Sequence, residues 1–189
     1  MTVVTFILFI YNDDMNSRSG KNKTKNLISL ALYSLMLRHP YDEISVKDIC
    51  EKAGVSRMSF YRYFSKKDDI FLDFCDERFE EFYTEINKSN VVTINEFSLG
   101  VFRYIKRYGR QINVLIMANK EFMLLNQLNS YAKYIISNMK TDYFMEQKNN
   151  PIFAYFMAGG LFNVTMFWVK NGFKASPEEM NDMLYRLAK

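Results

Sequence analysis

The stretch that decides the fold is EKAGVSRMSFYRYFSKKDD, residues 51–69, which places a glycine between two short helical patterns and then crowds aromatic and basic side chains together. Gly54 supplies the left-handed conformation that a sharp turn between helices commonly needs. Ser56 can cap the helix that follows, because its side chain can accept a hydrogen bond from a backbone amide two or three residues on. A catalytic loop, a membrane-surface helix and a DNA-reading helix can all be basic and aromatic, so the spacing has to distinguish them.

The signals around this stretch predict a helix-turn-helix. Ser45 and Asp48 have the spacing of a capping box, so a short helix is expected over 46–53. A second short helix is expected over 57–64, after a three-residue turn that contains the glycine. An earlier helix is expected in the apolar pattern of 23–40, which ends at a proline. The residues expected to close one small core between these helices are Leu27, Ala31, Leu35, Val46, Ile49, Cys50, Val55, Phe60 and Phe64.

The other side chains of the second helix are left on its outward and leading side. They are donors and aromatics, namely Ser56, Arg57, Met58, Ser59, Tyr61, Arg62 and Tyr63. The major groove of B-DNA admits a helix, and the residues at the N-terminal end of that helix reach the base edges. Arg57 could contact guanine through two hydrogen bonds, and Met58 could contact a thymine methyl. Phosphate contacts are expected from Ser59, Tyr61, Tyr63 and Lys67, fixing register rather than reading sequence.

The long helix that follows is expected to be capped by Ser65, with Lys66 and Lys67 in its first turn. Lysines there oppose the helix dipole, which predicts that they meet an anion at that end. The alternative is that they are solvated surface lysines balanced by Asp68 and Asp69.

Positive charge is concentrated in the same part of the chain. The whole sequence has a net charge of +4, whereas residues 16–67 alone carry 11 lysines and arginines against four acidic residues. The remainder is therefore net acidic. A compact basic portion on an acidic body is typical of a module that binds a polyanion.

The rest of the chain predicts further helices and no strands. The hydrophobic fraction is 49%, with seven glycines and three prolines, and helix-start and helix-stop signals recur without strand-length alternation. The fold class is therefore all-α, with about nine helices. The signals are a capping box at Thr93–Glu96, a stop at Gly109, a cap at Asn150–Pro151, a Schellman end at Gly172–Phe173 and a capping box at Ser176–Glu179.

No catalytic residue, metal ligand or cofactor site is expected. Cys50 and Cys75 lie in apolar helical patterns and lack the paired spacing of a zinc site, so they are expected to be buried free thiols. His39 is the only histidine and precedes a proline at a helix end, which leaves no partners for nucleophilic or metal-dependent catalysis. An enzyme is therefore not expected.

The N-terminus is expected to be an extension or arm over residues 1–22. The apolar run 3–11 is too short to cross a bilayer, which takes about 20 residues, and it lacks the features of a signal peptide. A cytoplasmic protein without membrane contact is expected. The natural start is either Met1 or Met15, and the apolar run, if present, is expected to pack on a groove.

The segment YDEISVKDICEKAGVSRMSFYRYFSKKDDI, residues 41–70, resembles the TetR family of bacterial one-component regulators. The shared pattern is AGVS, a Phe-Tyr pair, and YF followed three places on by lysine; the resemblance covers Lys23 to about Phe71. It implies a recognition helix over 57–64, the phosphate contacts named above, and a further contact from Thr24. Cys50 departs from the usual alanine. Met58 departs from the usual small residue, which is expected to alter operator choice.

The resemblance also implies a division into domains. Residues 23–67 are expected to form the DNA-binding domain and residues 68–189 a helical domain for dimerisation and regulation. The ending FMAGGLF…FWVKNGFKASPEEM is similar to a TetR subgroup that includes an activator of a dihydroxyacetone-kinase operon. Activation, or control by a partner protein, is therefore an alternative to repression.

Two sets of residues in this second domain are candidates for function. The helix 151–172 is apolar nearly all round and, with the helix 177–188, is expected to form a four-helix interface between two subunits. The expected interface residues are Ala158, Gly159, Phe162, Met166, Met183 and Leu187. An aromatic and methionine stripe either lines a pocket for a small hydrophobic effector or is simply core. It consists of Phe97, Val101, Tyr104, Tyr108, Met117, Phe122 and Tyr134.

The sequence therefore predicts a homodimeric, sequence-specific DNA-binding regulator that binds a palindromic double-stranded operator. The first hypothesis is a repressor controlled by a small effector. An activator or co-regulator whose second domain binds a partner protein is the alternative, and a closed C-terminal core would favour it.

Overall fold

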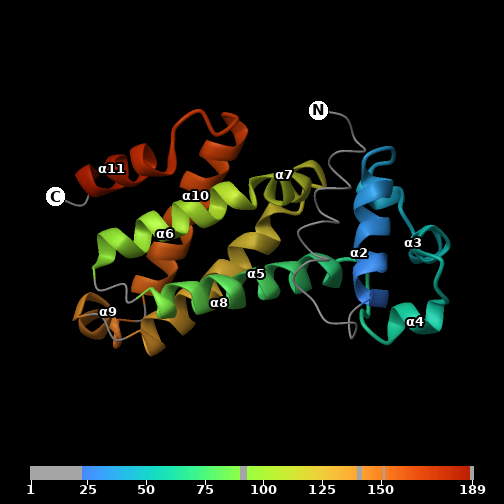
Figure 1. The fold of residues 1–189 in the computed structure, drawn as a ribbon, viewed down its shortest axis with the longest axis horizontal. Coiled ribbons are helices and arrows are strands. Elements are labelled where there is room, and N and C mark those ends of the chain that lie inside the picture. The colour runs from blue at the N-terminus through green and yellow to red at the C-terminus, as the bar shows by residue number, and fades with distance from the viewer. Residues whose placement is uncertain (1–22, 90–92, 140–141, 151, 188–189) are drawn as a thin grey trace. The chain divides into compact units, whose positions relative to one another are not determined.

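The computed structural model describes residues 23–89, 93–139, 142–150 and 152–187, and all the regular structure in those ranges is helical (Figure 1). It comprises ten α-helices and one 3-10 helix, which confirms the predicted all-α class. The described chain forms two compact units, divided between Asp73 and Phe74. The predicted arm, the apolar run 3–11 and Met15 lie outside the described residues.

The first unit contains three α-helices and a 3-10 turn, followed by the start of a longer helix. Its elements are α2 (Lys23–Met36), η2 (Tyr41–Glu43), α3 (Val46–Ala53), α4 (Arg57–Tyr61) and the beginning of α5 (Asp69–Lys88). Ile28, Leu32, Ile49 and Phe60 are completely buried, so a single small core joins α2, α3 and α4.

The inward face of α2 differs from the prediction by one position. Ala31 is buried as expected, but Leu27 and Leu35 are only half-buried. Ile28 and Leu32 take the central places instead. The reason is that α2 is covered on a second side as well, where Tyr33 contacts the ring of Phe71 at 6.0 Å between centroids.

The predicted helix starts and stops around the helix-turn-helix are confirmed. Ser45 and Asp48 form a complete capping box at the start of α3. Hydrogen bonds from the Ser45 side chain and backbone hold the pKa of Asp48 below its usual value. Gly54 ends α3 with φ +66°, in the left-handed region that favours glycine, and Ser56 caps α4 by accepting the Ser59 amide hydrogen at 3.0 Å.

The predicted first turn of the long helix is wrong. Helix α4 ends at Tyr61, and α5 begins only at Asp69, so both lysines precede the helix. The cause is the Asp69 carboxylate, whose Oδ2 accepts the backbone amide hydrogens of Ser65 at 2.9 Å and Lys66 at 3.0 Å. The carboxylate therefore holds the turn that precedes α5.

The second unit consists of the rest of α5 and six further helices: α6 (Ile94–Arg107), α7 (Gly109–Met117), α8 (Glu121–Asn138), α9 (Asp142–Gln147), α10 (Phe153–Lys170) and α11 (Pro177–Leu187). Helix α10 packs mainly against α8, and α11 packs along α6 (Figure 1). Trp168 of α10 is almost completely buried, in edge-to-face contact with Phe102 and Phe173, and its Nε1 donates to the Ala175 carbonyl at 3.0 Å.

Gly109 has a different role from the predicted helix stop. It is the first residue of α7, and Tyr108 alone separates it from α6. A Cβ at Gly109 would lie 2.1 Å from the Phe173 ring, so only glycine allows this close approach. The Schellman end that presents the ring is confirmed, because the Phe173 amide donates to the Trp168 carbonyl at 3.0 Å and the Gly172 amide to Val169 at 2.9 Å.

Candidate nucleic-acid interface

Helix α4 divides sharply between a buried and an exposed side. Phe60 is completely buried, whereas Met58 is 77% exposed and Tyr61 57% exposed. The seven residues predicted for the outward side lie on α4 and directly beside its two ends: Ser56, Arg57, Met58, Tyr61, Arg62 and Tyr63 are exposed and Ser59 is half-buried. These predicted contact residues are therefore accessible from solvent at α4 and its two ends.

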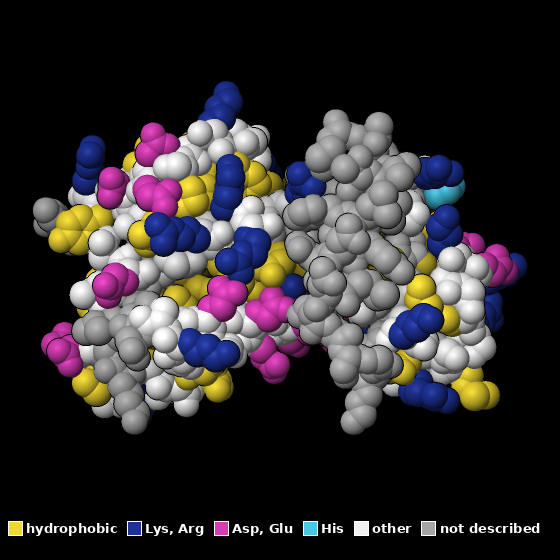
Figure 2. Space-filling view, in the orientation of Figure 1, with side chains coloured by type: hydrophobic (Ala, Val, Ile, Leu, Met, Phe, Trp, Pro, Cys, Tyr) yellow, Lys and Arg dark blue, Asp and Glu magenta, His cyan; other side chains and the backbone are white. Residues whose placement is uncertain are grey.

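The surface of the first unit carries many cations. Figure 2 shows lysine and arginine side chains interleaved with hydrophobic ones over α4. The exposed cations of α3, α4 and the following turn are Lys47, Lys52, Arg57, Arg62 and Lys66. Because exposed aromatic and methionine side chains adjoin these cations, the surface offers both phosphate ligands and apolar contacts for bases.

The two remaining predicted contacts lie outside α4. Thr24 is half-buried in the first turn of α2. Lys67 is also half-buried, and its ammonium donates to the backbone carbonyls of Tyr41 at 2.6 Å and Ile44 at 2.8 Å. These two bonds could not be predicted from local sequence signals, since they join residues more than 20 positions apart.

The aromatic and methionine residues predicted to line an effector pocket do not all lie around one cavity. Phe97 is buried in a core cluster around Phe82, with Val101 and Tyr104 packed against it. Met117, Phe122 and Tyr134 are instead 64%, 69% and 47% exposed. The core alternative therefore describes the first three residues, and the three exposed ones face solvent.

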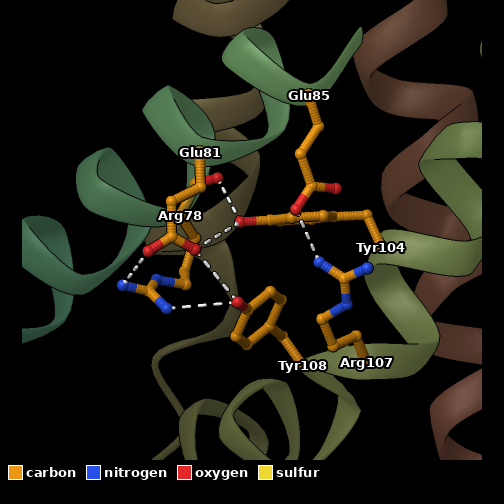
Figure 3. Close-up of polar contacts among 6 residues, drawn as sticks. All are labelled: Arg78, Glu81, Glu85, Tyr104, Arg107 and Tyr108. Carbon is orange, nitrogen blue, oxygen red and sulfur yellow. Dashed lines mark hydrogen bonds and ion pairs between the residues drawn. The ribbon is translucent and has the colours of Figure 1, made fainter. Parts of the chain in front are cut away.

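The hydroxyls of Tyr104 and Tyr108 in this stripe find partners within the protein (Figure 3). Tyr108 donates to the Glu81 carboxylate at 3.0 Å and accepts from the Arg78 guanidinium at 3.2 Å, and Tyr104 donates to the Arg78 carbonyl. Arg78 is itself buried and paired with Glu81 at 2.7 Å. Burial, as the main cause, raises the pKa of both phenols, which keeps them protonated as donors. The network thus links α5 to the end of α6.

A shallow pocket of about 190 Å³ lies between α5 and α6. Phe82, Ile86 and Tyr104 contribute apolar surface to it, and charged side chains border it. Arg107 pairs with Glu85 at 2.8 Å and Arg103 with Glu178 at 2.9 Å, so its cations already have partners. In the described part of the chain no group of histidine, cysteine and carboxylate side chains is arranged to hold a metal ion. None of the described helices is long and apolar enough to cross a membrane.

The residues predicted for a subunit interface include both buried and exposed side chains. Ala158, Phe162 and Met166 are buried within the unit, Gly159 is half-buried, and Met183 and Leu187 of α11 are exposed. Three of the six predicted interface residues are therefore packed mainly inside the unit.

The outward side of α10 carries Gly160, which the sequence marks as a place of close backbone approach, and three residues that the sequence did not single out. Phe156 is 72% exposed and Phe167 65% exposed, and Gly160 and Asn163 lie between them at helical spacing. We call these four residues the α10 stripe. The pattern of α10 is apolar all round and therefore could not show which side faces outward.

Comparison with known proteins identifies both parts of the chain. Residues 30–74 match the model of bacterial regulatory proteins of the tetR family, and residues 92–189 match a model described as a transcriptional regulator C-terminal region. The chain is also 25% identical over 146 residues to the HTH-type dhaKLM operon transcriptional activator DhaS of Lactococcus lactis subsp. lactis (strain IL1403). That similarity covers 75% of this chain and 77% of the relative.

Proposed function

Because the chain belongs to the TetR family of transcriptional regulators, whose members are DNA-binding factors rather than enzymes, we propose that it binds a palindromic operator as a homodimer through α4. Two copies of α4 would then enter successive turns of the major groove, with half-site centres about 34 Å apart. This role would place the protein in the cytoplasm, where the DNA is.

The observation that carries the proposal is the exposed side of α4. Arg57 and Met58 lie in its first turn, where a recognition helix reads bases, and both are exposed. Ser59, Tyr61 and Tyr63 follow them as hydroxyl donors for phosphates. Thr24 is a further phosphate ligand in this proposal, from the start of α2.

Replacing Arg57 with alanine is expected to relax the base preference at one position of each half-site. A bidentate contact from arginine to guanine provides about 1–3 kcal/mol of discrimination against the wrong base. The measurement is fluorescence anisotropy on an operator selected from random duplexes, with each half-site position varied in turn.

Lys52→Ala is the matched control, because Lys52 is an exposed cation of α3 and lies outside the reading helix. It should weaken binding about equally on every sequence. If the base preference of Arg57→Ala were the same as that of wild type, Arg57 would not be a residue that reads a base.

The dimer is proposed to form through the α10 stripe. Gly160 has no atom within 4 Å of the place where a Cβ would lie, so a second backbone can approach there. Two large exposed aromatic rings flank it on the same side of the helix. A self-complementary contact of this kind is what a two-fold interface requires.

Phe156→Asp is expected to weaken the dimer more than about 100-fold, because it would place an unpaired carboxylate in an apolar interface. Size-exclusion chromatography with light scattering measures the change. Met183→Asp is the control, since Met183 is 56% exposed on α11 and lies outside the stripe. If Met183→Asp dissociated the dimer and Phe156→Asp remained dimeric, the interface would have to lie on α11 instead of on the α10 stripe.

The sign of regulation is proposed to be activation, with a partner protein as the controlling ligand. The C-terminal residues predicted to line an effector pocket are packed or solvent-facing, and the similar Lactococcus protein is a transcriptional activator. The second candidate is a repressor controlled by a small effector, which the pocket between α5 and α6 favours. A promoter fusion in cells with and without the gene separates them: deletion lowers expression from an activated promoter and raises it from a repressed one.

A further inference from the structure

The four residues of the α10 stripe have the same spacing when they are read from either end of the helix. Phe156, Gly160, Asn163 and Phe167 follow one another at intervals of four, three and four positions. A large ring stands at each end and a smaller residue at each inner place. Intervals of three and four keep these residues on one side of the helix. A two-fold axis that crosses the helix between Gly160 and Asn163 would therefore lay the stripe of one copy against that of another, reversed in direction.

The relief of the stripe suits such a contact. The rings of Phe156 and Phe167 are 72% and 65% exposed. Nothing lies within 4 Å of the place where a Cβ on Gly160 would be, so the backbone is bare there. The Asn163 amide lies along its own helix, because its Nδ2 donates to the Gly159 carbonyl at 2.8 Å. The stripe is therefore high at its two ends and low in the middle.

The stripe also carries no charge. Helix α10 has no lysine, arginine, aspartate or glutamate from Phe153 to Val169, although the solvent-facing side of a surface helix is normally charged or polar. The neighbouring ring of Tyr155 is engaged within the unit, because Lys133 of α8 donates to its hydroxyl at 2.7 Å and lies 4.3 Å from its centroid. An uncharged aromatic surface with a polar border is typical of an interface between protein chains.

We propose that two copies of the chain pack their α10 stripes antiparallel, so that Phe156 meets the partner's Phe167 and Asn163 meets the partner's Gly160. This pairing rests on the homodimer proposed above and assigns each residue of the stripe its counterpart. The Asn163 amide fills the space beside the bare backbone of the partner's Gly160. It has a second N–H and an acceptor oxygen for a bond to that backbone. Because the axis is two-fold, every contact occurs twice.

A parallel packing of the same two stripes would fit less well. It would put glycine against glycine and asparagine against asparagine, so that one inner place would be left empty and the other overfilled. The centre of an interface is packed as densely as a protein interior, and an empty place loses its contacts outright. The antiparallel packing gives each inner place one amide and one bare backbone, so the two helices can stay equally far apart along the contact.

Chemical crosslinking of mixed variants tests the pairing. Phe156→Cys and Phe167→Cys are prepared separately, one with a larger tag, mixed until subunits exchange, and treated with a short bifunctional maleimide. The mixture should give a covalent heterodimer, because the two thiols lie opposite each other and the second phenylalanine pair remains intact. Neither variant alone should crosslink, because like positions are 11 residues apart along the contact, about 16 Å at the helical rise. Wild type is the background control, since Cys50 and Cys75 are buried.

Two results of this experiment would overturn the pairing. Crosslinking of Phe156→Cys with itself would show a parallel packing. Absence of a crosslinked heterodimer from the mixture, with the wild-type protein dimeric by light scattering, would show that the two rings do not meet. A wild-type protein that is monomeric by light scattering would instead contradict the proposed homodimer itself, and the pairing with it.

Opposite charges at the two ring positions give a second test. The double variant Phe156→Glu, Phe167→Lys should dimerise at least about tenfold more tightly than Phe156→Glu alone, since each introduced carboxylate would face an introduced ammonium. The like-charge double variant Phe156→Lys, Phe167→Lys is the matched control, and it should remain monomeric in light scattering over the same range of concentration. Equal association of the two double variants would overturn the pairing.

Discussion

Phe60→Ala is expected to lower the free energy of unfolding by about 3–5 kcal/mol, and with it to abolish operator binding. Phe60 is completely buried at the centre of the first unit and contacts the ring of Phe64 at 5.8 Å between centroids. Truncation would remove its apolar contacts and leave a cavity in a core too small to close it. Urea denaturation followed by circular dichroism measures the loss.

Tyr61→Ala is the matched control for this prediction. Tyr61 is the next residue of α4, but it is 57% exposed, so its loss should change the unfolding free energy by no more than about 0.5 kcal/mol. Operator affinity should nevertheless fall, because Tyr61 is a proposed phosphate contact. Similar unfolding free energies for the two variants would contradict the proposed division of α4 into a buried and a DNA-facing side.

Trp168→Ala is expected to destabilise the second unit by a similar amount, about 3–5 kcal/mol. Its ring is 1% exposed and lies 5.8 Å from Phe102 and 4.9 Å from Phe173. The substitution also leaves the Ala175 carbonyl without the Nε1 donor, which adds a hydrogen-bond loss to the cavity. Chemical denaturation at low protein concentration, where association contributes little, measures the change.

Phe167→Ala tests the neighbouring position. Phe167 is 65% exposed and belongs to the α10 stripe. It should leave the stability of the monomer within about 0.5 kcal/mol of wild type and weaken only the dimer. A large loss of monomer stability in Phe167→Ala, or a small one in Trp168→Ala, would show that α10 is oriented differently.

Local signals allowed much of the fold to be predicted from the sequence. The boxes at Ser45 and Thr93 cap α3 and α6 as expected, and Gly54 ends α3 in the left-handed region. These signals are reliable because each depends on a bond between residues three or four positions apart. The outward face of α4 followed from the same logic, once Phe60 was assigned to the core.

The errors arose where distant residues decide the outcome. The Asp69 carboxylate accepts hydrogen bonds from two backbone amides before α5, and the Lys67 ammonium in the same turn donates to the distant Tyr41 carbonyl. Gly109 is required by the ring of Phe173, which is 64 positions away. The aromatic stripe and α10 have no polar side that fixes their orientation, so composition alone could not separate core, pocket and interface residues.

Selection of binding sites from a pool of random duplexes tests the central claim most directly. The wild-type protein is expected to enrich one sequence with two inverted half-sites, their centres about one helical turn apart, or a multiple of it. The Arg57→Ala variant, selected in parallel, should return the same spacing with one position of each half-site relaxed. Failure of the wild-type protein to enrich any sequence, or enrichment of a site without inverted repeats, would contradict the account.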